Sequence, residues 1–64
     1  MKTNHNVYRL PLGTYYYYVD ENYIVRLKMD KDDKLDKYNY DVGNYYHRFE
    51  SAYEYVNRNS INNN

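Results

Sequence analysis

Four consecutive tyrosines, Tyr15 to Tyr18, limit the folds open to this chain more than any other feature. The run lies in a segment, 14–19, that is rich in residues favouring β-strands. Successive side chains of a strand point to opposite faces, so this strand is aromatic on both faces. Either a helix covers one face and a partner covers the other, or the outer face is an exposed aromatic patch. Tyrosine also tolerates partial exposure, which is the simplest explanation of the run.

A second alternation follows the tyrosines and predicts a β-hairpin. Residues 20–22 are polar and have the length of a hairpin loop. Residues 37–42 alternate once more and predict a third strand, after a charged loop at 30–37. The face of the second strand that we expect to be buried consists of Tyr23, Val25, Leu27 and Met29.

The segment after Gly43 supports two interpretations. In the first, Asn44 caps a helix that ends near Arg58. In the second, residues 45–49 form a fourth strand and Ser51 caps a shorter helix. We favour the long helix, because five apolar positions at helical spacing rarely arise by chance. Those positions are Tyr45, Phe49, Ala52, Tyr53 and Val56.

The sequence therefore predicts an α+β fold. We expect a small antiparallel β-sheet of three strands, or four in the second interpretation, with one C-terminal α-helix packed on one face. Residues 7–58 form this single domain, between a disordered N-terminal segment, 1–6, and a disordered Asn-rich tail, 59–64. A core this small has no disulfide to support it, so we expect a homodimer or stabilisation by a target.

The side chains offer little for catalysis. His5 and His47 have no second ligand at helical spacing, and a calcium loop at Asp30 and Asp32 fails where Lys34 replaces the third ligand. The chain has two glycines and no phosphate-binding loop. We therefore expect no enzyme, no catalytic residue, no cofactor and no metal site. An apolar stretch long enough for a membrane span and a signal region are both missing, which predicts a cytoplasmic protein, in the host cytosol if a phage encodes it.

Tyrosine and charge together favour a protein-binding module. The chain has twelve tyrosines and a formal net charge of zero. Tyrosine is enriched at interfaces, and the balanced charge disfavours sequence-independent DNA binding. AT-rich coding and the short chain suggest a phage or mobile element. In profile the chain resembles small phage-encoded antagonists of host defence and repair, such as anti-CRISPR proteins and uracil-DNA glycosylase inhibitors, although it shares no residue pattern with a particular family.

The predicted function is therefore inhibition of a larger host protein, a nucleic-acid-processing or defence enzyme, by blocking a surface. The register that buries the odd positions of the second strand also buries Tyr15 and Tyr17. Tyr16 and Tyr18 then become the exposed anchors. The predicted partner-binding residues are Tyr16, Tyr18, Arg26 and Lys28, the last two as contacts at the edge of the interface.

The alternative is a protein that binds single-stranded nucleic acid. Tyrosines of a sheet can stack on bases, and basic side chains can meet phosphates. The basic residues available for this role are Arg9, Arg26, Lys28 and Arg48. The absence of net positive charge makes direct contact with nucleic acid the weaker hypothesis.

Overall fold

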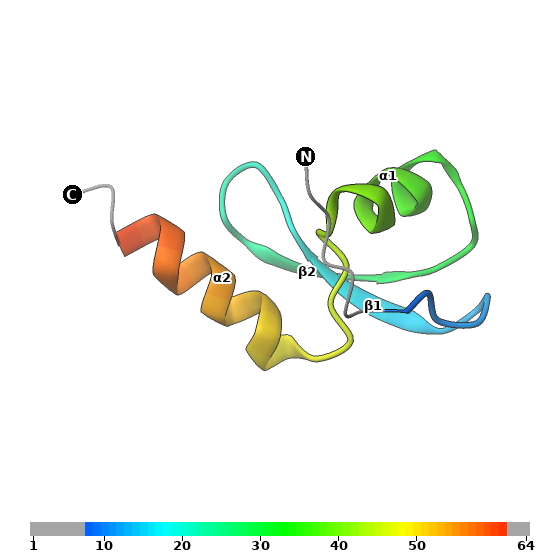
Figure 1. The fold of residues 1–64 in the computed structure, drawn as a ribbon, viewed down its shortest axis with the longest axis horizontal. Coiled ribbons are helices and arrows are strands. Elements are labelled where there is room, and N and C mark those ends of the chain that lie inside the picture. Colours follow the sequence, from blue (N-terminus) through cyan, green and yellow to red (C-terminus); the bar gives the residue numbers. More distant parts are fainter. Residues whose placement is uncertain (1–7, 62–64) are drawn as a thin grey trace.

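The computed structural model describes residues 8–61 (Figure 1). The protein combines a two-stranded antiparallel sheet with two helices, which confirms the α+β class but not the predicted number of strands and helices. The predicted N-terminal segment, 1–6, and the end of the predicted tail, 62–64, lie outside the described residues. The elements are β1 (Tyr15–Val19), β2 (Val25–Met29), α1 (Lys34–Val42) and α2 (Phe49–Ile61).

The predicted hairpin is confirmed. β1 and β2 pair with Tyr17 opposite Leu27, and the chain turns at the polar residues between them. Asp20 organises this turn, because its carboxylate accepts hydrogen bonds from the backbone N–H groups of Asn22 and Ile24, at 2.9 and 3.0 Å. Such local carboxylate-to-backbone bonds favour turns over continued strand.

Helix α1 replaces the predicted third strand, so the interpretation of residues 37–42 was wrong. Asp33 caps the helix in a reciprocal capping box with Asp36, and Gly43 ends it in a left-handed conformation with φ of 85°. The buried residues of this helix are Asp36 and Asn39. The apolar residues of α1 with helical spacing, Leu35, Tyr38 and Val42, are exposed, so the helix packs on the hairpin by its polar side.

The segment between the helices matches neither interpretation of the C-terminal half. Tyr46 forms an isolated antiparallel bridge with Tyr17, and the two backbone N–H···O distances are both 2.8 Å. This bridge extends the sheet by one residue on the free side of β1. Helix α2 then starts at Phe49 rather than at Asn44, contains Ser51 inside it, and continues to Ile61, into the segment predicted to be a disordered tail.

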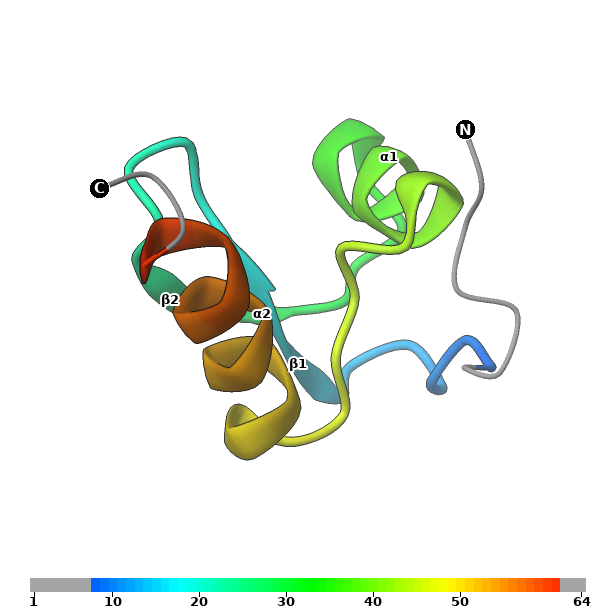
Figure 2. The same cartoon turned by 60° about the vertical axis from the view of Figure 1, so that its left-hand side comes forward.

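The two helices lie on opposite faces of the hairpin (Figure 2). On one face the Tyr16 hydroxyl donates to Asp36 of α1 at 2.7 Å. On the other face the Tyr17 ring meets the Phe49 ring of α2 edge to face, with centroids 6.0 Å apart. Helix α2 contacts both strands. Helix α2 therefore lies on the face of Leu27, but the expected burial of that face was wrong, because Leu27 and Tyr23 are 58 and 38 % exposed.

Candidate functional site

The four predicted partner-binding residues all lie on the α1 face of the hairpin. Tyr16 is completely buried, so the expectation that it points outward was wrong. Tyr18 is half-buried, and Arg26 pairs with Asp20 of the turn at 2.7 Å. Lys28 is directed at α1. Contacts of Tyr18, Arg26 and Lys28 with a partner remain a prediction.

The buried residue Asp36 explains why Tyr16 turns inward. Asn39 donates to the same Tyr16 hydroxyl at 3.0 Å, so this hydroxyl both donates and accepts a hydrogen bond. A buried hydroxyl needs partners, and α1 supplies both of them. The carboxylate oxygens of Asp36 accept hydrogen bonds of 2.7 to 3.2 Å from the Tyr16 hydroxyl, Lys28 Nζ and the backbone N–H groups of Lys31 and Asp33.

These contacts fix the protonation of the Tyr16–Asp36 pair. Burial alone would raise the pKa of Asp36, but the hydrogen bonds from Lys28 and Tyr16 outweigh it and hold that pKa well below its ordinary range. Burial and the bond to Asp36 raise the pKa of the Tyr16 hydroxyl well above its ordinary value. At neutral pH the tyrosine is therefore a neutral donor and the aspartate a charged acceptor.

A second buried Tyr–Asp pair lies beside the first. The Tyr45 hydroxyl donates to Asp30 at 2.7 Å and accepts the backbone N–H of Leu10 at 2.9 Å. The Arg9 guanidinium donates two hydrogen bonds to the same carboxylate, from Nε at 2.7 Å and from Nη2 at 2.8 Å. The hydrogen bond from Arg9 is the main reason that the pKa of Asp30 falls to about 2.

The rings of Tyr16 and Tyr45 join the two pairs into one cluster. They stack with centroids 4.3 Å apart and planes within 18°. Both rings and both carboxylates are buried, and no polar side-chain atom buried in the described residues lacks a partner. A site whose polar atoms are saturated and shielded has no free group to offer a substrate. This polar cluster therefore holds α1, the hairpin and the segments at Leu10 and Tyr45 together.

The α2 face of the hairpin carries an exposed aromatic strip instead. Tyr17 is flanked by Tyr15 along β1 and by Leu27 across the ladder. Phe49 meets Tyr17, and Tyr53 stacks on Phe49 with centroids 5.9 Å apart. We define the aromatic strip as Tyr15, Leu27, Phe49 and Tyr53, which are 54, 58, 48 and 51 % exposed.

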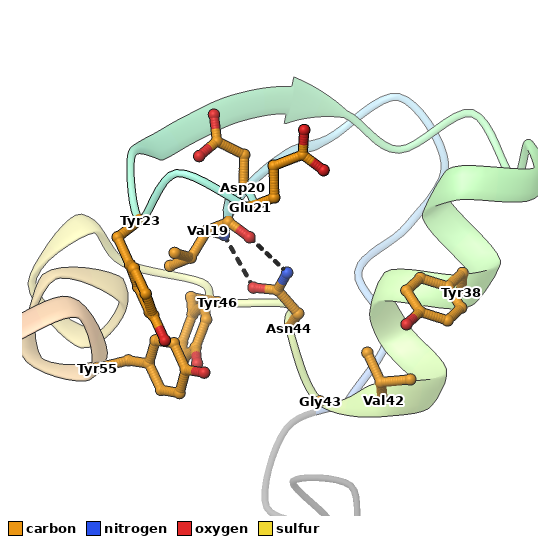
Figure 3. Close-up of a pocket in the computed structure, with 10 residues that line it drawn as sticks. All are labelled: Val19, Asp20, Glu21, Tyr23, Tyr38, Val42, Gly43, Asn44, Tyr46 and Tyr55. Atoms are coloured by element: carbon orange, nitrogen blue, oxygen red, sulfur yellow. Dashed lines mark hydrogen bonds between the residues drawn. The ribbon is translucent and has the colours of Figure 1, made fainter. Parts of the chain in front are cut away.

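A pocket of about 350 Å³ opens where the hairpin turn lies between the two helices. Three tyrosines, Tyr23, Tyr46 and Tyr55, gather at one side of it, and Val42 of α1 stands at the other (Figure 3). Asn44 lies between them, where its amide exchanges two hydrogen bonds of 2.8 Å with the backbone of Val19. The remaining lining residues are Asp20, Glu21, Tyr38 and Gly43.

Comparisons with protein-family models, curated proteins and solved structures found no match to this chain. Within residues 8–61, neither helix has the length and apolar character needed to cross a membrane. The same residues contain no group of three or more histidines, aspartates or glutamates arranged to hold a metal ion. The function must therefore be argued from the surfaces just described.

Sequence reasoning missed the residues that make these two surfaces. Phe49 and Tyr53 were assigned to the core stripe of the helix, but only Ala52 between them is completely buried. Their spacing from Ala52 places them together on one flank of α2, and Tyr55 on the opposite flank. An aromatic on each side of a single small buried residue was the available signal that the helix packs by a narrow stripe.

Proposed function

We propose that this protein is a non-enzymatic binding module that docks on a larger protein through the aromatic strip. The observation that supports the proposal is the exposure of four large apolar side chains that adjoin one another on the α2 face. Contiguous exposed apolar surface of this kind marks interaction sites more often than scattered exposed residues do. Aromatic side chains also supply much contact area for little loss of conformational entropy.

The backbone beside the strip favours a partner that presents an extended segment. Tyr17 directs its N–H and C=O groups to Tyr46. The ladder between the strands therefore uses Tyr16 and Tyr18, and the backbone groups of Leu27 point to the other side of β2. β2 has β1 as its single strand neighbour in the described residues. Such an edge can accept another strand, whose side chains would then lie against the strip.

The basic side chains do not favour the alternative, binding of single-stranded nucleic acid. Arg9, Arg26 and Lys28 are each paired with an aspartate at 2.7 to 3.1 Å. Phosphate contacts would require these pairs to open, which costs free energy for the buried aspartates in particular. We therefore propose a protein as the partner, with a nucleic-acid-processing or defence enzyme of the host as the specific class.

The test compares two exposed leucines on opposite faces. Leu27→Asp places a charge in the strip, and Leu35→Asp places the same charge on α1, on the other side of the hairpin. Tagged full-length protein and both variants are used to capture proteins from the lysate of the host cell. We expect one partner to be held by the wild type and by Leu35→Asp, and to be depleted at least about 30-fold with Leu27→Asp.

The enzymatic activity of the captured partner then tests whether this protein is an inhibitor. If the partner is an enzyme, wild type and Leu35→Asp should inhibit it and Leu27→Asp should not. Circular dichroism of both variants must first show an unchanged cooperative unfolding transition. A partner retained equally by both leucine variants would contradict docking through the strip. Loss of a dimer by Leu27→Asp in light scattering, with no other protein captured, would assign the strip to self-association instead.

A further inference from the structure

Helix α1 carries its apolar residues on the outside. Leu35, Tyr38 and Val42 recur at the spacing of one helix face, and they are 41, 62 and 37 % exposed. We define the α1 stripe as these three residues. The side chains that the helix buries are those of Asp36 and Asn39. Because the apolar side of a surface helix normally faces the core, α1 presents a contact surface that residues 8–61 leave uncovered.

The α1 stripe borders open space along its whole length. The pocket of about 350 Å³ reaches Val42, and a second hollow of about 620 Å³ reaches Leu35. Tyr38 lines both of them, and both also share Val19 and Asn44 as lining residues. The two hollows therefore lie next to each other between α1 and the hairpin turn, and another helix can approach the stripe without moving this chain.

Two charged residues of α1 are placed against the dipole of their own helix. Lys34 is the first residue of α1, and Asp41 lies in its last turn. The N-terminus of a helix carries a partial positive charge and the C-terminus a partial negative charge, so a lysine at the start and an aspartate at the end are both unfavourable. Neither side chain makes a hydrogen bond or ion pair with residues 8–61 that would offset this cost.

The same two charges suit a second copy of the helix. Lys34 and Asp41 are seven positions apart, which places them on one flank of α1 beside Tyr38. If a second α1 runs antiparallel to the first, stripe against stripe, Lys34 of each copy lies beside Asp41 of the other. Lys34 then also approaches the C-terminus of the neighbouring helix, and Asp41 approaches its N-terminus. Charges that are unfavourable within one copy are therefore favourable between two copies.

We propose that two copies of this chain form an antiparallel dimer through α1, with the α1 stripes packed on each other and an ion pair between Lys34 and Asp41 at each end. The formal net charge of zero means that no overall repulsion opposes this contact. Helix α2 lies on the other face of the hairpin (Figure 2), so each copy keeps its aromatic strip uncovered. The dimer does not depend on docking through that strip.

The size of the contact sets the concentration at which the dimer forms. Helix α1 has nine residues, and at 1.5 Å per residue it is about 13 Å long. A helix pair of this length buries less than the roughly 800 Å² per partner of a stable interface, so we expect a dissociation constant on the order of 0.1–1 mM. At about 10 µM, a usual concentration for circular dichroism, the chain is then mostly monomeric, and unfolding reports on single copies.

Sedimentation equilibrium of the full chain between about 0.05 and 2 mM measures the dimer. We expect the average mass to rise with concentration toward that of two chains. Leu35→Asp puts a charge in the stripe and should weaken the dimer at least about 30-fold, whereas Leu27→Asp, on the other face, should leave the dissociation constant unchanged. The same two variants have the reverse effects on capture of a partner protein, so failure of one proposal is distinguishable from failure of the other.

Charge reversal tests the antiparallel arrangement. Lys34→Glu and Asp41→Lys each place like charges side by side at both ends and should weaken the dimer at least about fivefold. Each change favours α1 itself, by an acid at its N-terminus or a base at its C-terminus, so loss of the helix cannot explain the effect. The double variant restores opposite charges and should recover the wild-type dissociation constant within about twofold.

Glu54→Lys is the matched control, because it changes the net charge as Asp41→Lys does but lies exposed on α2. It should leave the dissociation constant unchanged. A monomer mass at about 2 mM would show that the stripe does not hold a second copy. Loss of the dimer with Leu27→Asp but not with Leu35→Asp would assign self-association to the aromatic strip. A double variant as weak as Lys34→Glu alone would show that Lys34 and Asp41 do not face each other, which contradicts the antiparallel dimer.

Discussion

The two faces of the hairpin are built from the same tyrosine run and have opposite character. On the α1 face Tyr16 is buried, and its hydroxyl is used by Asp36 and Asn39. On the α2 face Tyr15 is about half exposed and belongs to the aromatic strip. Tyrosine serves both faces because it has a large apolar ring and one polar atom. The partner available to the hydroxyl, rather than the ring, decides which tyrosines become core.

This difference assigns separate tasks to the two faces. The α1 face stabilises the fold through charge-assisted hydrogen bonds between segments distant in the sequence, such as Arg9 with Asp30. The α2 face contributes a narrow contact at Ala52 and leaves its larger aromatics accessible. A 64-residue chain without cysteine can expose this much apolar surface only if the opposite face supplies stability.

The largest effect should come from Asp36→Ala. Four donors lose their acceptor, and one of them is the Lys28 ammonium at 2.8 Å. Removing one member of a buried pair costs about 3–5 kcal/mol, which equals the whole stability expected of a domain this small. We therefore expect the cooperative transition in thermal or urea unfolding, followed by circular dichroism, to disappear.

Asp41→Ala is the matched control for that experiment, since Asp41 is exposed on the same helix. Its effect on the free energy of unfolding should stay within about 0.5 kcal/mol. Equal urea midpoints for the two alanine variants would show that the polar cluster does not hold the fold, and the contrast between the faces would fail.

The second largest effect should come from acid, which lowers the free energy of unfolding that the buried aspartates of the α1 face contribute. The pKa of Asp30 is lowered from 3.8 to about 2 in the folded protein, so the carboxylate contributes stability that is complete above its unfolded value. That contribution is lost as the pH falls from about 4 through 2, and amounts to roughly 2 kcal/mol. The lowered pKa of Asp36 acts in the same direction.

Urea midpoints measured from pH 7 to pH 2 check this expectation. The free energy of unfolding should change little between pH 7 and 5, because both aspartates are charged in the folded and unfolded chains there. The decline should begin near pH 4, and Asp30→Asn should make it shallower. Midpoints that remain constant down to pH 2 would show that the two buried carboxylates are not coupled to folding.

The elements that the sequence predicted correctly are those whose apolar residues repeat with the period of the structure. The hairpin and the C-terminal helix both have such a repeat. In helix α1 the helical repeat of Leu35, Tyr38 and Val42 competes with the alternation of 37–42, and the residues that the helix buries are Asp36 and Asn39. Its signals were local: an aspartate pair spaced for a capping box before it and Gly43 after it. Weighing those signals above the alternation of 37–42 would have identified the helix.

The site was harder to predict for a related reason. Alternation shows that Tyr15 and Tyr16 face opposite sides but not which side is buried, since both faces are aromatic. The choice is made by Asp36, twenty positions away along the chain, whose own burial depends on α1. A long-range polar contact of this kind has no signature in the local pattern. The pocket depends likewise on the placement of three separate segments around Asn44.

The smallest expected effect comes from removing one hydroxyl oxygen from each face of the hairpin. This pair of substitutions tests the difference between the two faces most directly. Tyr16→Phe deletes the hydroxyl that joins Asp36 and Asn39, and leaves both partners buried with unmet hydrogen bonds. This should cost about 1–3 kcal/mol. Tyr17→Phe deletes a hydroxyl that makes no hydrogen bond with residues 8–61, and should change the free energy of unfolding by less than about 0.5 kcal/mol.

Both variants keep the ring, the strand propensity and the aromatic contacts, so the comparison isolates the hydroxyl. Urea unfolding at pH 7 measures both, and the slope of the transition should be the same because the buried area is unchanged. If the two substitutions cost the same, hydrogen bonding does not distinguish the faces, and the burial of Tyr16 must come from ring packing against Tyr45 alone. If only Tyr16→Phe lowers the free energy of unfolding, the Tyr16 hydroxyl is the group that places this side of the tyrosine run in the core. The α2 face is then free for a partner.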